Sequence, residues 1–348
     1  MTDEYKRELH IPLPQTDTGK VQMVCPRGDC EPGRFFLGDA PSERPEAGNS
    51  TPTRREPGTD GVTCPYCGKD DSDDAFRHPD DAAYLEKAID HGVEEVAHEM
   101  IGELLDNHFT QPFKRMGRAS RRSGFSVTVE SRPYRQQPKS PPRPPARADL
   151  PRNVTCTACA RAYGVFAIAL FCPDCGSSNV LVHFARERRL CEDELASARE
   201  TSDRERALRK LGNAHEDAVS ATEAYLKSIY ALVIGVRRPA DGEKKLTKVG
   251  NAFQSIERGK KLFAPLGVDL YGMLMEGELK FLDASMAKRH VVTHNLGVVD
   301  KKHVERTGQG KAGELISLTE RDVRRHLELV ERVISDLERS VPELQPSP

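Results

Sequence analysis

Two histidines and an arginine lie close together in the stretch KRHVVTHNLGVVD, residues 288–300. Arg289 can hold a phosphate through two parallel hydrogen bonds, and its charge persists at any physiological pH. A histidine such as His290 or His294 can move a proton in a transition state near neutral pH. Because RNA carries its own nucleophile, the ribose 2′-hydroxyl, these residue types suffice for phosphodiester cleavage without a metal ion.

Two other interpretations of the same residues remain open. His290 and His294 are four apart, so they share a face of a helix, and His-x3-His is a familiar zinc spacing. Against a metal site, the motif contains no carboxylate, and the neighbouring arginine would repel a cation. The third interpretation is structural: positive side chains in the last turn of a helix interact favourably with its dipole.

The elements that would position these side chains are helices. Apolar spacing predicts one helix from about 276 to 293, ended by a glycine at position 297. Further helices are indicated by apolar residues at three- and four-residue steps, namely Ala218, Ala221, Tyr225, Ile229, Leu232 and Val236, and later Val323, Leu327, Val330, Ile334 and Leu337. Thr319, three residues before Asp322, predicts the start of the last helix.

The stretch RHVVTH resembles the Arg-x4–6-His motif of HEPN domains, including the polar residue that this family often shows directly after the arginine. The flanking segments NAFQSIERGKKLFAPLGVDLYGML, ELKFLDASMAKRHVVTHNLGVVDKKHVERTG and ELISLTERDV are also similar to one HEPN subgroup. The resemblance covers roughly residues 190–340, which is less than half of the chain.

This resemblance implies a helical bundle that dimerises and cuts RNA as a metal-independent endoribonuclease. Arg289 would hold the scissile phosphate, His294 would act as general acid and base, and His290 would orient the substrate or the catalytic groups. The products would be a 2′,3′-cyclic phosphate and a 5′-hydroxyl. The alternative is a non-catalytic HEPN scaffold that dimerises, while other parts of the chain bind nucleic acid or a protein.

Nine cysteines are present, and eight of them form four close pairs. Cys156-x2-Cys159, twelve residues and Cys172-x2-Cys175 predict a zinc ribbon, because two tight turns can each offer two thiolates to one tetrahedral ion. The stretches YGVFAIALF (163–171) and NVLVHF (179–184) are expected to form its strands. Four sulfur ligands leave no open position, so the zinc would be structural.

A second zinc site is expected from the first two cysteine pairs, Cys25 with Cys30 and Cys64 with Cys67. Its first pair has a wider spacing, and the alternative is that one pair binds no metal. The segment at about 40–61 is rich in proline, glycine and charge, which predicts a disordered insertion. The remaining cysteine, Cys191, is expected to be an inert thiol on a helix.

The chain is therefore predicted to be multidomain, mainly α in its C-terminal half, with two small β zinc ribbons. The expected parts are a first ribbon (1–77), a helix at 79–109 and a strand at 125–135 within 78–136, a Pro/Arg-rich linker (137–152), a second ribbon (153–185), a HEPN-like domain (186–342) and a tail (343–348).

The expected partners are RNA, a second copy of the chain and a regulatory protein such as an antitoxin. The family resemblance suggests a prokaryotic defence or toxin–antitoxin setting. A formal net charge of −2 argues against a uniformly basic nucleic-acid-coating protein. The apolar runs are too short to cross a bilayer and no signal peptide is visible, so a cytoplasmic location and no membrane contact are expected.

Overall fold

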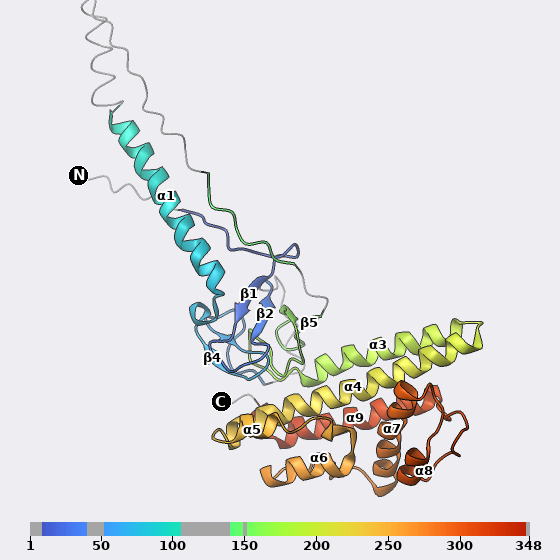
Figure 1. Cartoon of the computed structure of the whole chain (residues 1–348). Helices are drawn as coiled ribbons and strands as arrows, with labels where there is room; N and C mark the ends of the chain where they lie inside the picture. The colour runs from blue at the N-terminus through green and yellow to red at the C-terminus, as the bar shows by residue number, and fades with distance from the viewer. Residues whose placement is uncertain (1–8, 40–51, 106–139, 149–151, 346–348) are drawn as a thin grey trace, which may run out of the picture. The chain divides into compact units, whose positions relative to one another are not determined.

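The computed structural model describes residues 9–39, 52–105, 140–148 and 152–345 (Figure 1). The chain divides into two compact units. Unit 1 comprises residues 1–22 and 77–148, and unit 2 comprises residues 23–76 and 149–348.

Unit 1 is built on one long helix, α1 (Pro79–Leu105), which begins where the sequence predicts. A buried carboxylate, Asp81, lies in the first turn of α1 and forms a 2.7 Å ion pair with Arg147. Residues 140–148, in the predicted linker, have no helix or strand, yet this ion pair ties them to α1. The predicted strand at 125–135 lies outside the described residues.

Unit 2 begins with a small antiparallel sheet in the order β1-β2-β6-β5. Its strands are β1 (Val21–Val24), β2 (Arg34–Leu37), β5 (Asn153–Thr155) and β6 (Ala162–Val165). The central pair, β2 and β6, joins segments far apart in the sequence, with Phe35 opposite Val165 and Leu37 opposite Tyr163. The two predicted ribbons therefore share one sheet. A second sheet is formed by β3 (Val62–Thr63) and β4 (Asp70–Asp71).

The prediction of a strand at 179–184 is wrong, because this segment begins a helix. Helix α3 (Val180–Glu200) starts there, and Val180 and Phe184 bury one helical face in the core of unit 2. The backbone amide of Asn179 donates to the Leu170 carbonyl, and its side chain donates to the Tyr163 hydroxyl. Packing thus overrides the strand preference of the β-branched residues. The stretch 163–171 is likewise a strand only up to Val165.

The rest of unit 2 is helical. Its α-helices are α3, α4 (Arg204–Arg237), α5 (Gly242–Leu246), α6 (Ile256–Phe263), α7 (Glu276–His294), α8 (Lys301–Thr307) and α9 (Glu320–Ser340). Helices α3 and α4 run side by side along most of their length, and α7 and α9 pack against α4 (Figure 1). Together these four helices enclose the main hydrophobic core.

The predicted helix ends that frame the candidate site are confirmed within about one residue. Helix α7 ends at His294, after which Gly297 adopts a φ of 81° and its amide donates to the Val291 carbonyl. Helix α9 begins with a capping box in which the Thr319 hydroxyl accepts from the Asp322 amide at 3.2 Å, and the Asp322 carboxylate accepts in return.

Helix α4 is long and apolar enough to satisfy the length and composition criterion for a membrane span, and it is the one such helix among the described residues. Half of its apolar window is buried inside the protein. This burial is what the central helix of a helical core requires.

A buried polar chain crosses the interface of α4, α7 and α9. The Ser285 hydroxyl on α7 lies 3.1 Å from Nε2 of His215 and 2.9 Å from Nδ1 of His326. The other ring nitrogen of His326 lies 2.9 Å from the Thr222 hydroxyl, which donates to the Ala218 carbonyl. Both imidazoles and the serine are buried, so this chain fixes how α7 is rotated against α4 and α9.

Replacing Ser285 by alanine is expected to destabilise unit 2. The substitution removes two hydrogen bonds and leaves two buried imidazole nitrogens unpaired, one on His215 and one on His326, and each unpaired group costs about 1–3 kcal/mol. Denaturant unfolding followed by the helical signal measures this loss. The control is Ser340→Ala at the exposed end of α9, which should change stability by less than about 0.5 kcal/mol. Equal stability of the two variants would contradict the role assigned to Ser285.

The same buried histidines predict acid sensitivity. Burial lowers the pKa of His215 to about 4 and the pKa of His326 to about 3, whereas an unfolded histidine titrates near 6.5. Between these pH values the unfolded chain binds more protons than the folded chain does. The two histidines therefore leave the free energy of unfolding at its full value above about pH 6.5, and they reduce it as the pH falls below that value. From pH 7.5 to 5.0, linkage gives a loss of about 2 kcal/mol per histidine.

The His326→Gln variant separates this loss from the acid sensitivity of the cysteine clusters, which both proteins share. Its stability should fall by about 2 kcal/mol less than that of the natural chain over the same pH interval. An identical pH dependence in the two proteins would show that His326 is not buried in its neutral form.

Candidate functional site

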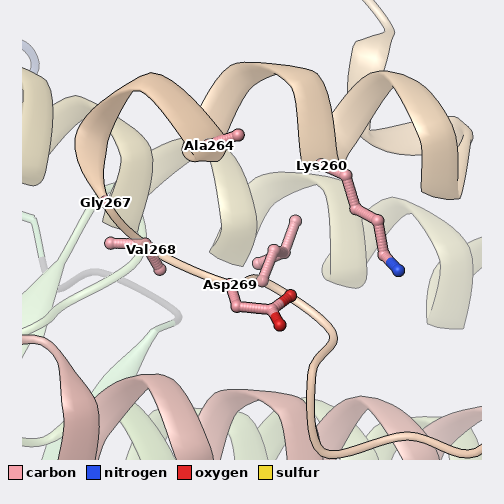
Figure 2. A pocket seen from close by; sticks show the side chains of 6 residues that line it. Lys260, Ala264, Gly267, Val268 and Asp269 are labelled. Atoms are coloured by element: carbon pink, nitrogen blue, oxygen red, sulfur yellow. The ribbon is translucent and has the colours of Figure 1, made fainter.

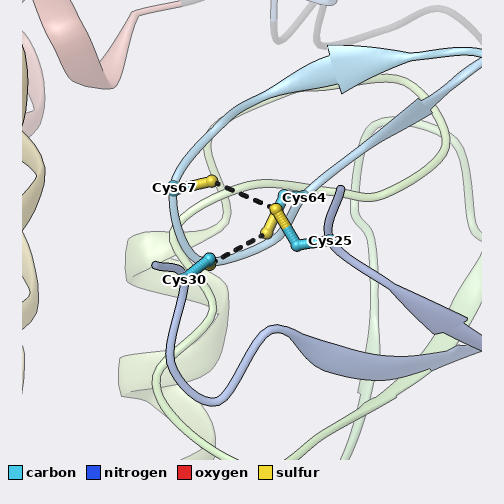
Figure 3. A group of neighbouring side chains, drawn as sticks. All are labelled: Cys25, Cys30, Cys64 and Cys67. Carbon is cyan, nitrogen blue, oxygen red and sulfur yellow. Dashed lines mark hydrogen bonds between the residues drawn. The ribbon is translucent and has the colours of Figure 1, made fainter. Parts of the chain in front are cut away.

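The eight paired cysteines gather into two clusters of four, and within each cluster the sulfur atoms lie within 4.8 Å of one another. The first cluster is Cys25, Cys30, Cys64 and Cys67 (Figure 3), and the second cluster is Cys156, Cys159, Cys172 and Cys175. The widely spaced pair, Cys25 and Cys30, therefore forms one site with Cys64 and Cys67, as the sequence predicts. Two metal ions can be held by these clusters.

The sulfur positions fit a tetrahedral metal ion. The Sγ atoms of Cys25 and Cys67 are 3.7 Å apart, and those of Cys159 and Cys172 are 3.6 Å apart. Four sulfurs placed tetrahedrally at about 2.3 Å from zinc would be about 3.8 Å apart, whereas a disulfide requires about 2.05 Å. Hydrogen bonds among the thiols lower the pKa of Cys67 and of Cys156 and raise the pKa of Cys64 and of Cys159, because the sulfur atoms of each cluster lie so close together.

The two clusters share a short sequence pattern and the same turn geometry. Each ends in the sequence Cys-Pro-x-Cys-Gly, in which the glycine has a positive φ, 71° at Gly68 and 68° at Gly176. The two turns also exchange backbone hydrogen bonds: the Thr63 amide donates to the Pro173 carbonyl, and the Phe171 amide donates to the Pro65 carbonyl. The clusters are thus parts of one paired structure.

Arg54 lies in the segment that the sequence predicts to be disordered, and it contacts the turns of both clusters. The Arg54 guanidinium donates to the Gly68 carbonyl at 2.7 Å, and its backbone amide donates to the Cys175 carbonyl. The same guanidinium stacks 4.4 Å from the centre of the Phe171 ring. The prediction of disorder is therefore wrong for 52–61, while residues 40–51 lie outside the described part of the chain.

The second cluster is joined directly to helix α3. The Ala169 amide donates to Nδ1 of His183 at 2.9 Å, inside the protein, and the Ser178 hydroxyl donates to Glu338 on α9. Further along α3, burial raises the pKa of the Cys191 thiol to about 12, so this cysteine is inert as expected. The paired clusters and the helices form one unit.

On α7, Arg289 is turned toward α4. Its guanidinium forms a 3.7 Å ion pair with Glu216, and both side chains are partly exposed. The Nε atom of Arg289 is buried and has no hydrogen-bond partner among the described residues. The terminal part of the guanidinium is therefore partly exposed and paired with one carboxylate, while Nε is enclosed.

The two motif histidines share the other side of the last turn of α7. The ring centres of His290 and His294 are 5.0 Å apart, and both side chains are exposed. Residues five apart on a helix point about 140° apart, so α7 does not turn Arg289 and His294 to the same face. Within the described residues, only the cysteine clusters bring three or more potential metal ligands together, so the metal interpretation of these histidines lacks a third ligand there.

A cavity of about 360 Å³ lies next to His290, between the start of α6, the middle of α7 and α8. Arg258, Lys302, His303 and Arg306 line it together with His290. Except for His290, no motif in the sequence pointed to these residues as part of the site. Lys302, His303 and Arg306 form a basic group shortly after the motif, but Arg258 lies about thirty residues before it, and only the packing of three helices brings them together.

A second cavity, of about 370 Å³, lies beside α6 (Figure 2). It is lined by Lys260, Ala264, Gly267, Val268, Asp269 and Leu270. Its one basic and one acidic side chain balance in charge, and it contains none of the motif residues. This cavity therefore adds nothing to the Arg–His site.

Comparisons of this chain with family models, with curated proteins and with solved structures find no match. The similarity to HEPN domains therefore rests on the motif of residues 289–294 and on its flanking segments.

Arg54 is expected to control how firmly the paired clusters hold metal. Arg54→Ala removes a charge-assisted hydrogen bond and a cation–π contact, each worth about 1 kcal/mol or more. Metal transfer to a coloured chelator should become about tenfold faster, equivalent to about 1.4 kcal/mol. The control is Arg27→Ala, because Arg27 lies in the first cysteine turn but pairs there with the exposed Asp29. Equal release rates in the two variants would contradict the bridging role.

Proposed function

We propose that this protein is a metal-independent endoribonuclease of the HEPN type. The observation that carries the proposal is the pair of exposed histidine rings, His290 and His294, 5.0 Å apart at the end of α7 and beside a basic cavity. Exposed imidazoles can reach a large substrate, and basic side chains next to them favour a polyanion.

The reaction would follow from the nucleophile that RNA supplies. A histidine accepts the proton of the 2′-hydroxyl while the 2′-oxygen bonds to phosphorus, and the bond from phosphorus to the 5′-oxygen breaks. A second, protonated histidine donates a proton to that leaving oxygen. Arg289 would stabilise the charge on the phosphoryl oxygens. His294 would be the proton-transfer residue, and His290 would orient it or the substrate.

A homodimer is part of this proposal. Arg289 and His294 point about 140° apart on one helix, so a site that uses both on one phosphate is more easily completed by a second α7. Three exposed apolar side chains follow the motif, Leu296, Val298 and Leu315, and exposed apolar groups of this kind often mark an interface. A twofold contact through this surface would bring two copies of the motif together.

The cysteine clusters would bind structural zinc. We propose that the paired ribbons recognise the RNA target or a regulatory protein, including an antitoxin. Their direct attachment to α3 would let a partner bound at the ribbons influence the helices that carry the motif. A prokaryotic defence role is proposed from the family resemblance alone, and a cytoplasmic location is proposed from the short apolar runs and the lack of a visible signal peptide.

Ribonuclease activity is tested with a pool of end-labelled RNAs and no added divalent metal. The full-length protein should leave 2′,3′-cyclic phosphate ends. The His294→Ala variant should cut about 10²–10⁴-fold more slowly, as for loss of general acid–base catalysis, and Arg289→Ala about 10²–10³-fold. His98→Ala, which removes an exposed histidine of α1, should cut as the natural chain does.

No cleavage by the natural protein, with all variants equally dimeric, would favour the second candidate function. The Arg289–Glu216 ion pair is the observation that favours it, because a paired arginine can serve structure alone. In that case the helical part is a non-catalytic scaffold.

Removal of the carboxylate beside Arg289 is expected to strengthen RNA binding. An exposed ion pair is worth about 0.2–1 kcal/mol, so Glu216→Gln should raise the affinity for RNA by up to about fivefold. Fluorescence anisotropy with a labelled oligonucleotide measures the change. The control, Glu200→Gln, makes the same change of charge at an exposed position of α3 and should raise the RNA affinity less. An equal rise in affinity for the two variants would mean that Arg289 does not contact the RNA.

A further inference from the structure

The cavity next to His290 has the charge of an anion-binding site. Its lining includes three permanent cations, Arg258, Lys302 and Arg306, and no acidic residue. Arg306 is partly neutralised by Asp283 on α7, at 3.0 Å. Arg258 and Lys302 form no ion pair within the described residues; Arg258 donates only to the neutral side chain of Asn251.

The cavity is held in shape by contacts between its walls. Asp283 accepts hydrogen bonds from both the Ile256 amide at the start of α6 and the Arg306 guanidinium on α8. Arg306 also donates to the Gln254 carbonyl at 3.0 Å. These bonds connect α6, α7 and α8, and they hold in place the backbone from which the cationic side chains of the cavity extend.

One wall carries an unused polar group. His303 is only 5% exposed, and its Nδ1 atom is buried without a hydrogen-bond partner in the part of the chain that the structure describes. Its backbone amide is already occupied by the Asp300 carboxylate at 2.7 Å. A buried polar atom without a partner is costly.

We propose that this cavity is a second phosphate subsite, which binds the RNA phosphodiester adjacent to the one that is cut. Arg258 and Lys302 contact the phosphate oxygens, Arg306 adds positive charge, and His290 lies at the boundary between this subsite and the cleavage site. The subsite rests on the proposed function for its place in the reaction. Its binding chemistry depends only on the cavity.

The test is binding of a labelled oligonucleotide with 2′-O-methyl riboses to the full-length protein, because this probe cannot form a cyclic phosphate and is not consumed. Arg258→Gln and Lys302→Gln should each weaken binding by several-fold at low salt. Each should also reduce the slope of log affinity against log salt concentration by about 0.7, as for one lost phosphate contact on a single strand. The control is Lys301→Gln, the exposed neighbour outside the cavity, which should keep affinity within twofold.

Equal losses in Lys301→Gln and Lys302→Gln would overturn the proposal, since they would indicate general charge attraction. Affinity for inorganic phosphate that is lost in Arg258→Gln, together with unchanged oligonucleotide binding, would assign the cavity to free phosphate and also overturn it. If the natural protein cleaves RNA but the Arg258→Gln and Lys302→Gln variants bind the oligonucleotide normally, the subsite is refuted and the nuclease proposal stands. Cavity-dependent binding without any cleavage refutes the nuclease proposal and supports the subsite as an RNA-binding site.

Discussion

The convergence of eight cysteine sulfurs into two tetrahedral clusters is the constraint on which the architecture of unit 2 depends. The first cluster joins a hairpin at 21–37 to a turn at 64–67, and β2 pairs with β6 across more than 120 residues of sequence. A sheet of such short strands has little apolar surface of its own, so metal–thiolate bonds at these clusters would supply much of its folding free energy. Reciprocal backbone hydrogen bonds and Arg54 then make two small ribbons into one body.

This body continues into the helices without an intervening linker. His183 and Asn179 connect the second cluster to the first turn of α3, α3 lies along α4, and α4 supplies both Glu216 at the surface and His215 in the interior. The buried chain through Ser285 fixes the rotation of α7 about its axis. In this orientation Arg289 pairs with Glu216 on α4, and His290 and His294 are exposed. The cysteine clusters and the helix that carries the motif are thus joined by a continuous series of packed elements.

Local signals in the sequence predicted much of this structure. The ends of α7, the Thr319 cap and the membership of both cysteine clusters depend on a few neighbouring residues or on ligand chemistry, and they are confirmed. The helical start of α3 could not be predicted, because Val180 and Phe184 suit a strand until their tertiary partners are known. The fusion of the ribbons, the packing of 52–61 and the cavity beside His290 depend on contacts between distant segments, which periodicity and spacing do not encode.

The central claim is that unit 2 is organised by two tetrathiolate metal sites. Native mass spectrometry of the full-length chain, purified without added metal or chelator, tests it most directly. We predict a mass that exceeds the reduced chain by two zinc ions less the protons they displace. We also predict that Cys64→Ser or Cys172→Ser lowers the zinc content to one ion or less per chain. A fully folded chain that carries no metal, or that shows the loss of protons expected for disulfides, would contradict this account.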